Sequence, residues 1–482
     1  MTRRRTSRRL FQASPAKGER QQESEEEVLS ERTISSLPDA LLLEVFRQLA
    51  RLPPVTDAEE EALYSRRLPF RTFESPGEVH PGLRAYPFLA QVCRHWKRVL
   101  ESPAALQALW GELCIDFGHE LITGVHVPVA WSDVRPSDDE FAAAFAAVRL
   151  QSHRLVEFVR ARRGVLRRLT LTNSEGYFSE DGDFVPVNSK HNFNLGTLGI
   201  VLGMLQDRLE HLHMAHCNDL FAAGSPLGTI AMVGGLRSLV LDDLQCRLYR
   251  EPLAELGRLT RLTELVLTAT QRHGVFIFGI DCIPDTWSQL SNLRSLELRG
   301  NALLEALPPW MPEALPRLEL LDVSACSRLD LRTITALTQL RTLALQAMDL
   351  VSGGTPPRLV QQASAHGMVP RAKLMPDLSH MARLTALNLA DNNLIEVPPC
   401  ILKLTGLEVL DLSGNFFLEF PQAPTPLHAF SRLRWLDLRA VHVEEGGRYW
   451  SPGKCTTMQH VAALAKALRR KNRHAKILHD TS

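Results

Sequence analysis

Leucines recur along this chain at a fixed spacing, with polar residues between them. The pattern LxxLxLxxN/C begins at ten leucines, and three copies match it to the ninth position: LRSLELRGN (293–301), LTALNLADN (384–392) and LEVLDLSGN (407–415). Two further copies, LEHLHMAHC (209–217) and LELLDVSAC (318–326), end in cysteine. The ten first leucines are Leu166, Leu209, Leu236, Leu262, Leu293, Leu318, Leu340, Leu384, Leu407 and Leu433. Most copies lie about 20–29 residues apart, which is the period of a stacked repeat.

This spacing predicts one short strand in each copy. Leucines at positions one, four and six lie on the inner side of the strand and of the turn before it. An Asn or Cys at position nine can satisfy backbone groups that the following turn leaves unpaired. Two long gaps between copies predict insertions near 175–200 and 349–378. The ten copies resemble the leucine-rich repeat family, which implies a solenoid with a parallel sheet on its concave face.

Two apolar stripes at helical spacing precede the repeats. The first lies in LPDALLLEVFRQL (37–49) and the second in FLAQVCRHWKRVLESPAALQALW (88–110). Together they resemble an F-box, with its LP helix, its VCxxW helix and its SPxLW segment. The resemblance is carried by Leu37, Pro38, Leu41, Val45, Phe46, Leu49, Val92, Cys93, Arg94, Trp96, Ser102, Pro103, Leu109 and Trp110.

The F-box family docks onto a Skp-type adaptor, which joins it to a cullin and a RING ubiquitin ligase. The resemblance implies an adaptor-binding set of Leu37, Pro38, Leu41, Leu42, Val45, Phe46, Leu49, Val92, Trp96 and Trp110. Ala40 stands where the family usually has an acidic residue, and residues 51–85 separate the two helices as an insertion. The alternative interpretation is a helix pair that only caps the repeat array, because solenoids need a cap with a polar outer face.

The expected fold class is α/β, with an all-helical F-box module followed by a leucine-rich repeat solenoid of about ten repeats. The helix at 137–164, with a capping box at its start and Gly164 at its end, would couple the two parts. The predicted segments are a disordered tail (1–33), the F-box (34–117), a linker with the coupling helix (118–164), the repeats (165–445), and a capping helix with a basic tail (446–482).

Polar residues at positions three, five and seven of the repeats would line the concave face. Neighbouring strands lie about 4.8 Å apart, so the position-five residues would form a partly acidic stripe, interrupted by Ala344. The candidate substrate-binding set is Glu297, Arg299, Asp322, Asn388, Asp411, Trp435, Asp437 and Arg439. An equally weighted alternative is that Asp is common at this position because it hydrogen-bonds along the ladder.

Composition excludes several other classes. The chain has 482 residues and a net charge of +1, from 55 Lys+Arg and 54 Asp+Glu, which argues against bulk electrostatic binding to nucleic acid. No apolar run is long enough for a membrane span. The eight cysteines form no CxxC pair, so we expect no zinc ribbon and a reducing cytoplasmic or nuclear setting. His211, His213 and His216 lack a nearby acidic or thiolate ligand, and we expect no metal site.

No catalytic motif was found, so we expect a non-enzymatic protein without catalytic residues or cofactors. The leading hypothesis is the substrate-recognition subunit of an SCF-type ubiquitin ligase, which binds a Skp adaptor through the F-box and a protein substrate through the repeats. Two alternatives stay open: a leucine-rich repeat scaffold outside any ligase, in cytoskeletal or signalling assemblies, or a small-molecule receptor gated by the loops at 174–194 and 351–373. Neither a nucleic-acid partner, a membrane nor a homo-oligomer is implied.

Overall fold

The fold is known from a computed structural model. It describes residues 96, 98–99, 102, 111–116, 153, 155–172, 176–178, 184–186, 195–215, 217, 226–244, 246–269, 279–351, 373–394, 397–415, 430–439, 466 and 475–478. The chain divides into two compact units. One comprises Met1–Pro54 with His80–Leu109, and the other comprises Val55–Val79 with Trp110–Ser482.

The second unit is built on a parallel sheet of twelve strands, in the order β1-β2-β5-β6-β8-β10-β11-β12-β15-β16-β17-β18. Each of the ten leucine motifs supplies one of the ten inner strands. The strands are β1 (Glu112–Asp116), β2 (Arg168–Thr172), β5 (His211–Ala215), β6 (Ser238–Leu244), β8 (Glu264–Ala269), β10 (Ser295–Glu297), β11 (Leu320–Asp322), β12 (Thr342–Ala344), β15 (Ala386–Asn388), β16 (Val409–Asp411), β17 (Trp435–Asp437) and β18 (Lys476–Leu478).

The two outermost strands lie outside the predicted repeats. β1 falls in residues that the sequence places in the F-box module, and β18 falls in the expected basic tail. Neither ELCID nor KIL contains the three-leucine set, because an outermost strand packs against one neighbour only. β18 is nevertheless paired in the ladder. The Lys476 N–H donates to the Arg434 carbonyl at 2.8 Å, and the Leu438 N–H donates to the Leu478 carbonyl at 3.0 Å.

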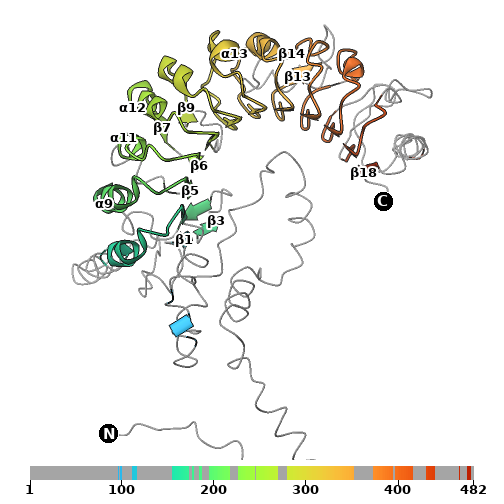
Figure 1. The fold of residues 1–482 in the computed structure, drawn as a ribbon. Helices are drawn as coiled ribbons and strands as arrows, with labels where there is room; N and C mark the ends of the chain where they lie inside the picture. The colour runs from blue at the N-terminus through green and yellow to red at the C-terminus, as the bar shows by residue number, and fades with distance from the viewer. Residues whose placement is uncertain are drawn as a thin grey trace, which may run out of the picture. The chain divides into compact units, whose positions relative to one another are not determined.

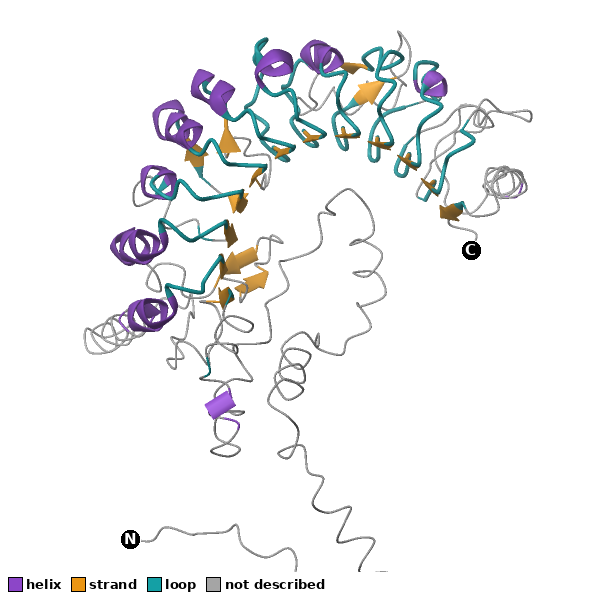
Figure 2. Cartoon of the chain, in the orientation of Figure 1, coloured by secondary structure: helices purple, strands orange, loops and turns teal. Residues whose placement is uncertain are grey.

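Leucines form the core between the sheet and the outer connections. In the repeat that contains β10, Leu293, Leu296 and Leu298 are at most 1% exposed. The outer connections are short helices on the side away from the strands (Figures 1 and 2). They are α9 (Leu195–Leu205), α11 (Leu227–Ala231), α12 (Arg250–Glu255), η2 (Leu256–Arg258), η3 (Asp285–Gln289), α13 (Met311–Ala314), η4 (Leu331–Ala336) and η5 (Ile401–Lys403). No described helix is long and apolar enough to cross a bilayer.

The ninth position of the motif satisfies backbone groups, as predicted. The buried Asn392 amide donates to the Leu345 carbonyl of the previous repeat at 2.8 Å, while its Oδ1 accepts from the N–H groups of Met348 and Leu350 at 3.0 Å. The Cys326 Sγ donates to the Leu298 carbonyl at 3.0 Å. Because each side chain reaches back to the preceding repeat, position nine ties successive turns together. The array is a leucine-rich repeat solenoid.

Position eight has a conformational requirement that the motif letters do not state. In six repeats this residue has a positive φ, between 51° and 78°. These residues are Asp243, Gly300, Ala325, Ala347, Asp391 and Gly414. The left-handed conformation is unfavourable for residues with a Cβ, so four of the six repeats adopt it at an energetic cost.

The insertions carry small sheets of their own. In the first, β3 (Gly176–Phe178) pairs antiparallel with β4 (Phe184–Pro186). Outside the insertions, β7 (Arg247–Leu248) pairs in parallel with β9 (Gly279–Ile280). In the second insertion, β13 (Leu350–Val351) pairs in parallel with β14 (Lys373–Leu374), which brings the two ends of that loop together.

Little of the predicted helical parts falls within the described residues. Trp96 and Val99 lie in a helical segment and are 8% and 3% exposed, as the second apolar stripe predicts. The other nine adaptor-binding residues, Leu37, Pro38, Leu41, Leu42, Val45, Phe46, Leu49, Val92 and Trp110, lie outside the described part of the chain. Residues 155–162 of the coupling segment are helical, with Val159 buried. Of the predicted C-terminal capping helix, only Lys466 is described, and it is helical.

Candidate protein-binding surface

The position-five residues stand side by side on the strand face of the sheet. Glu297 is in register with Asp322, and Asp322 with Ala344. Ala344 pairs with Asn388, which in turn pairs with Asp411. The row ends where Asp411 pairs with Asp437. The structure thus aligns this row as the motif spacing predicts, because one repeat contributes one strand without a shift in register.

Most of the row is more buried than a ligand-binding stripe was expected to be. Glu297, Asp322, Asn388 and Asp437 are between 2% and 6% exposed. Asp411 is the half-buried member of this row. Of the other candidate residues, Arg299 is buried, Trp435 is half-buried and Arg439 is exposed. The burial follows from the close spacing of the strands, which lets each side chain cover its neighbour.

A shared hydrogen bond explains why Asp and Asn recur at position five. In each case the side-chain Oδ1 accepts from the backbone N–H two residues later. Asp322 accepts from Ser324 at 2.9 Å and Asn388 from Ala390 at 2.9 Å. Asp411 accepts from Ser413 at 3.0 Å and Asp437 from Arg439 at 3.0 Å. The N–H is one that the turn leaves without a strand partner. These side chains therefore have a structural role, in line with the alternative raised from the sequence.

Two of the three aspartates are neutralised by arginines at position seven. The Arg299 guanidinium lies 2.8 Å from Asp322 Oδ2, and both side chains are buried. Arg439 forms a forked contact with Asp437, at 2.8 Å from Nη2 and 3.1 Å from Nε. Asp411 forms no ion pair with an arginine among the described residues. Burial and the neighbouring Asp437 charge raise the pKa of Asp411 to about 7, although the two Ser413 hydrogen bonds and the Arg439 charge act to lower it. Among the described residues, Asp411 is thus the aspartate of this row whose charge is not offset by an arginine ion pair.

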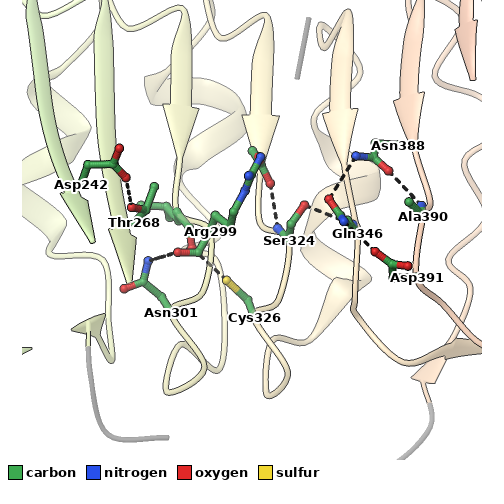
Figure 3. A network of polar contacts seen from close by, with 12 residues as sticks. Asp242, Thr268, Arg299, Asn301, Ser324, Cys326, Gln346, Asn388, Ala390 and Asp391 are labelled. Carbon is green, nitrogen blue, oxygen red and sulfur yellow. Dashed lines mark hydrogen bonds and ion pairs between the residues drawn. The ribbon is translucent and has the colours of Figure 1, made fainter. Parts of the chain in front are cut away.

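Position-seven residues extend this polar network across the strands, as Figure 3 shows. The Gln346 N–H donates to Ser324 Oγ at 3.1 Å, and Gln346 Nε2 donates to Asp391 Oδ2 at 2.8 Å. Asn388 Nδ2 donates to Gln346 Oε1 at 3.5 Å. The sequence-based candidate set did not include Ser324 or Gln346, although both stand at position seven, which is expected to face the concave side.

An apolar patch lies beside the acidic row and was also missed. Leu320, Thr342, Ala386, Val409 and Trp435 are position-three neighbours in register across β11, β12, β15, β16 and β17. Ala386 and Ala344 are buried with Val409 packed against them. The half-buried side chains of Leu320, Val409 and Trp435 lie over or beside the buried alanines. We call this set the apolar patch: Leu320, Ala344, Ala386, Val409 and Trp435.

The first strands carry a separate polar group. Asp242 accepts a hydrogen bond from Thr268 (Figure 3), and its other oxygen lies 4.0 Å from His213 Nε2. Burial lowers the pKa of the His211 imidazole, and the positive charge of Arg168 lowers it further. Among the described residues, no three His, Cys, Asp or Glu side chains are grouped as metal ligands would be.

Comparisons with known proteins give structural similarity only. No protein-family model and no curated protein matches the chain. An internalin from Listeria monocytogenes aligns at 16% identity and a TM-score of 0.32, over 60% of this chain and 64% of its own. A plant peptide hormone receptor, RGFR1 in complex with RGF2, aligns at 16% and 0.32, over 65% and 47%. A leucine-rich repeat protein of Leptospira interrogans aligns at 17% and 0.28, over 66% and 85%. The chain spans less than two thirds of the first two proteins.

Proposed function

We propose that this protein is the substrate-recognition subunit of an SCF-type ubiquitin ligase. The F-box-like segments would bind a Skp-type adaptor and, through it, a cullin, while the repeat array would hold the protein substrate. The observation that carries the proposal is the order of the motifs LP, VCRHW and SP–LW along the chain, ahead of the leucine-rich repeats in the sequence. The chain would contribute proximity and orientation rather than chemistry.

The candidate surface supports protein binding by the array. Leu320, Val409 and Trp435 are the half-buried members of the apolar patch, which leaves apolar surface, including part of the Trp435 ring, for a partner. Aromatic side chains surrounded by charged groups are common at the centre of protein interfaces. The adjoining Asp411 favours a substrate segment that carries an apolar side chain next to a basic one.

Co-purification with a Skp-type adaptor tests the ligase proposal. We expect the wild-type chain to retain the adaptor, and the double variant Leu41→Asp/Val45→Asp to lose it, because charges would enter the apolar stripe. Leu374→Asp is the matched control, since it makes the same chemical change at a leucine that is 67% exposed in the array. Failure of the wild type to bind, or equal binding by the double variant, contradicts the proposal.

The second candidate is an interaction scaffold outside any ligase, which Ala40 and the insertion at 51–85 favour. The same purification separates the two. A scaffold would retain partners that Trp435→Ala loses, but no adaptor, cullin or ubiquitin. A substrate receptor would lose those partners on Trp435→Ala while it keeps the adaptor.

A further inference from the structure

One edge of the sheet carries an arginine in nearly every repeat. We define the leading rim as positions zero and two of the motif, the residues on either side of its first leucine, where the chain turns into each strand. From β5 to β17 the leading rim holds nine exposed arginines: Arg208, Arg237, Arg261, Arg294, Arg317, Arg341, Arg383, Arg432 and Arg434. For a chain with a net charge of +1, this is a strong local excess of one sign.

The arginines alternate between the two positions from one repeat to the next. Position zero supplies the arginine before β5, β8, β11 and β15, and position two supplies it before β6, β10 and β12. The repeat of β16 has none, and the repeat of β17 has one at each position. The result is a zigzag row with one guanidinium per strand along most of the rim.

Backbone hydrogen bonds fix the spacing of this row. The Arg237 N–H donates to the Glu210 carbonyl at 2.7 Å, the Arg294 N–H to the Thr263 carbonyl at 2.8 Å, and the series continues through every repeat to Arg434. The rim therefore keeps the strand spacing of about 4.8 Å. Arginines at the same motif position stand two strands apart, at roughly 9.6 Å.

Only some of these charges are balanced within the rim. Glu210 lies 3.5 Å from Arg237, Glu319 lies 3.8 Å from Arg294, and Glu408 lies 3.5 Å from Arg434. Of the other six, Arg317 donates to Asn292 Oδ1 at 2.6 Å. The remaining five form no ion pair with a residue that the structure describes: Arg208, Arg261, Arg341, Arg383 and Arg432. Four of these five stand at position zero, so one line of the zigzag presents its charge to solvent.

We propose that the leading rim binds an extended acidic protein segment that carries a carboxylate at every third residue. A polyproline II segment has three residues per turn and advances about 3.1 Å per residue, so every third side chain lies on one face, about 9.3 Å from the next. This matches the distance between position-zero arginines. Guanidinium groups bind carboxylates through two parallel hydrogen bonds, which adds geometric selectivity to charge attraction.

The rim favours a protein segment over a nucleic acid for two reasons. Its three glutamates would repel a continuous row of phosphates but tolerate a segment with spaced charges. Proteins that bind single strands without sequence preference also stack bases on aromatic side chains. No Phe, Tyr or Trp stands at position zero or two of the ten motif copies. The inference needs no ligase assembly, so it is independent of the function proposed above.

Fluorescence anisotropy with the full chain tests this inference. The probes are a labelled 15-residue peptide with Glu at every third position, a peptide of equal composition with its glutamates grouped, and a 15-nucleotide oligodeoxythymidine. We expect the spaced peptide to bind tightest and to weaken as salt rises. Arg261→Gln/Arg341→Gln/Arg383→Gln should weaken it about tenfold or more, from three lost ion pairs. The charge-matched control Arg250→Gln/Arg328→Gln/Arg332→Gln changes exposed arginines outside the rim and should alter binding by less than about twofold.

A charge-reversal variant distinguishes a loss of specific binding from a loss of folding. Arg261→Glu/Arg383→Glu should lose the spaced glutamate peptide and gain a peptide with Lys at every third position. Equal losses in the rim and control variants would overturn the proposal, as would unchanged binding in the rim triple variant. Tighter binding of the oligonucleotide than of either peptide would reassign the rim to nucleic acid, and equal binding of the spaced and grouped peptides would refute the spacing argument.

Discussion

Asp322 and Asp411 occupy the same motif position, yet their neighbours give them opposite electrostatics. Both accept a hydrogen bond from the N–H two residues on. Asp322 is paired with the buried guanidinium of Arg299, so its charge is required where it stands. Asp411 faces Asp437 across the ladder, and its pKa rises from 3.8 to about 7. A residue's role on this surface is therefore set by the adjacent strands more than by the motif.

We predict that Asp411→Asn stabilises the protein at neutral and higher pH. The folded state holds the Asp411 proton more tightly than the unfolded chain does, so this group's contribution falls as pH rises from about 4 to about 7. Asn keeps the acceptor for the Ser413 N–H, as Asn388 does for Ala390. The free energy of unfolding from denaturant titrations at pH 5 and pH 8 should differ less in the variant, which gains on the order of 1–4 kcal/mol at pH 8.

The matched comparison is Asp322→Asn, which makes the same change at the same motif position three repeats away. It should destabilise the fold at both pH values by about 3–5 kcal/mol, because the buried ion pair between Arg299 and Asp322 would be broken. If the two variants shift stability in the same direction, the assignment of opposite electrostatics to these aspartates is wrong.

At the scale of the element, the turn after the strand places specific demands on two positions of the motif in several repeats. Position nine supplies the buried amide or thiol, and position eight supplies a left-handed residue. Gly300 and Gly414 adopt this conformation at little cost, whereas Ala325 and Ala347 do so with a Cβ. The repeats with alanine at position eight are therefore less well optimised than their neighbours.

We predict that Ala325→Gly raises the stability of the array and that Gly300→Ala lowers it. Relief of the left-handed strain at Ala325 exceeds the added entropy of glycine in the unfolded chain, for a net gain of about 0.5–1 kcal/mol. A Cβ at Gly300 would overlap the Ala269 carbonyl oxygen, for a loss of about 3 kcal/mol or more. Thermal unfolding followed by circular dichroism measures both. A loss of stability in Ala325→Gly would contradict the strain argument.

Periodicity predicts the inner strands of this fold well, because each leucine triplet has a single way to enter the core. Strand positions and the alignment of Glu297, Asp322, Asn388, Asp411 and Asp437 follow from it. The burial of that row and the network through Gln346 did not follow, because they depend on side chains from different repeats. The strands β1 and β18 were missed because short sequences with one packed face carry no periodic signal.

At the scale of the whole array, stability is the sum of each repeat and its contacts with two neighbours. β18 closes the sheet beyond β17, and its Ile477 is 3% exposed. An unprotected last strand would present open N–H and C=O groups to other chains. The C-terminal strand therefore protects the repeat that carries Trp435 and Asp437, at one end of the candidate protein-binding surface.

We predict that Ile477→Ala loosens the end of the array and leaves the centre intact. Truncation of a buried isoleucine costs about 2–5 kcal/mol, and a terminal strand passes that loss to one neighbour only. Hydrogen exchange should quicken at the Leu438 amide, which donates to Leu478, while amides of β10 and β11 keep their protection. Leu321→Ala, at a buried leucine of a central strand, is the comparison and should speed exchange in repeats on both sides. Uniform loss of protection across the sheet in Ile477→Ala would show that the array unfolds as one cooperative body, because a nearest-neighbour array confines the defect to its end.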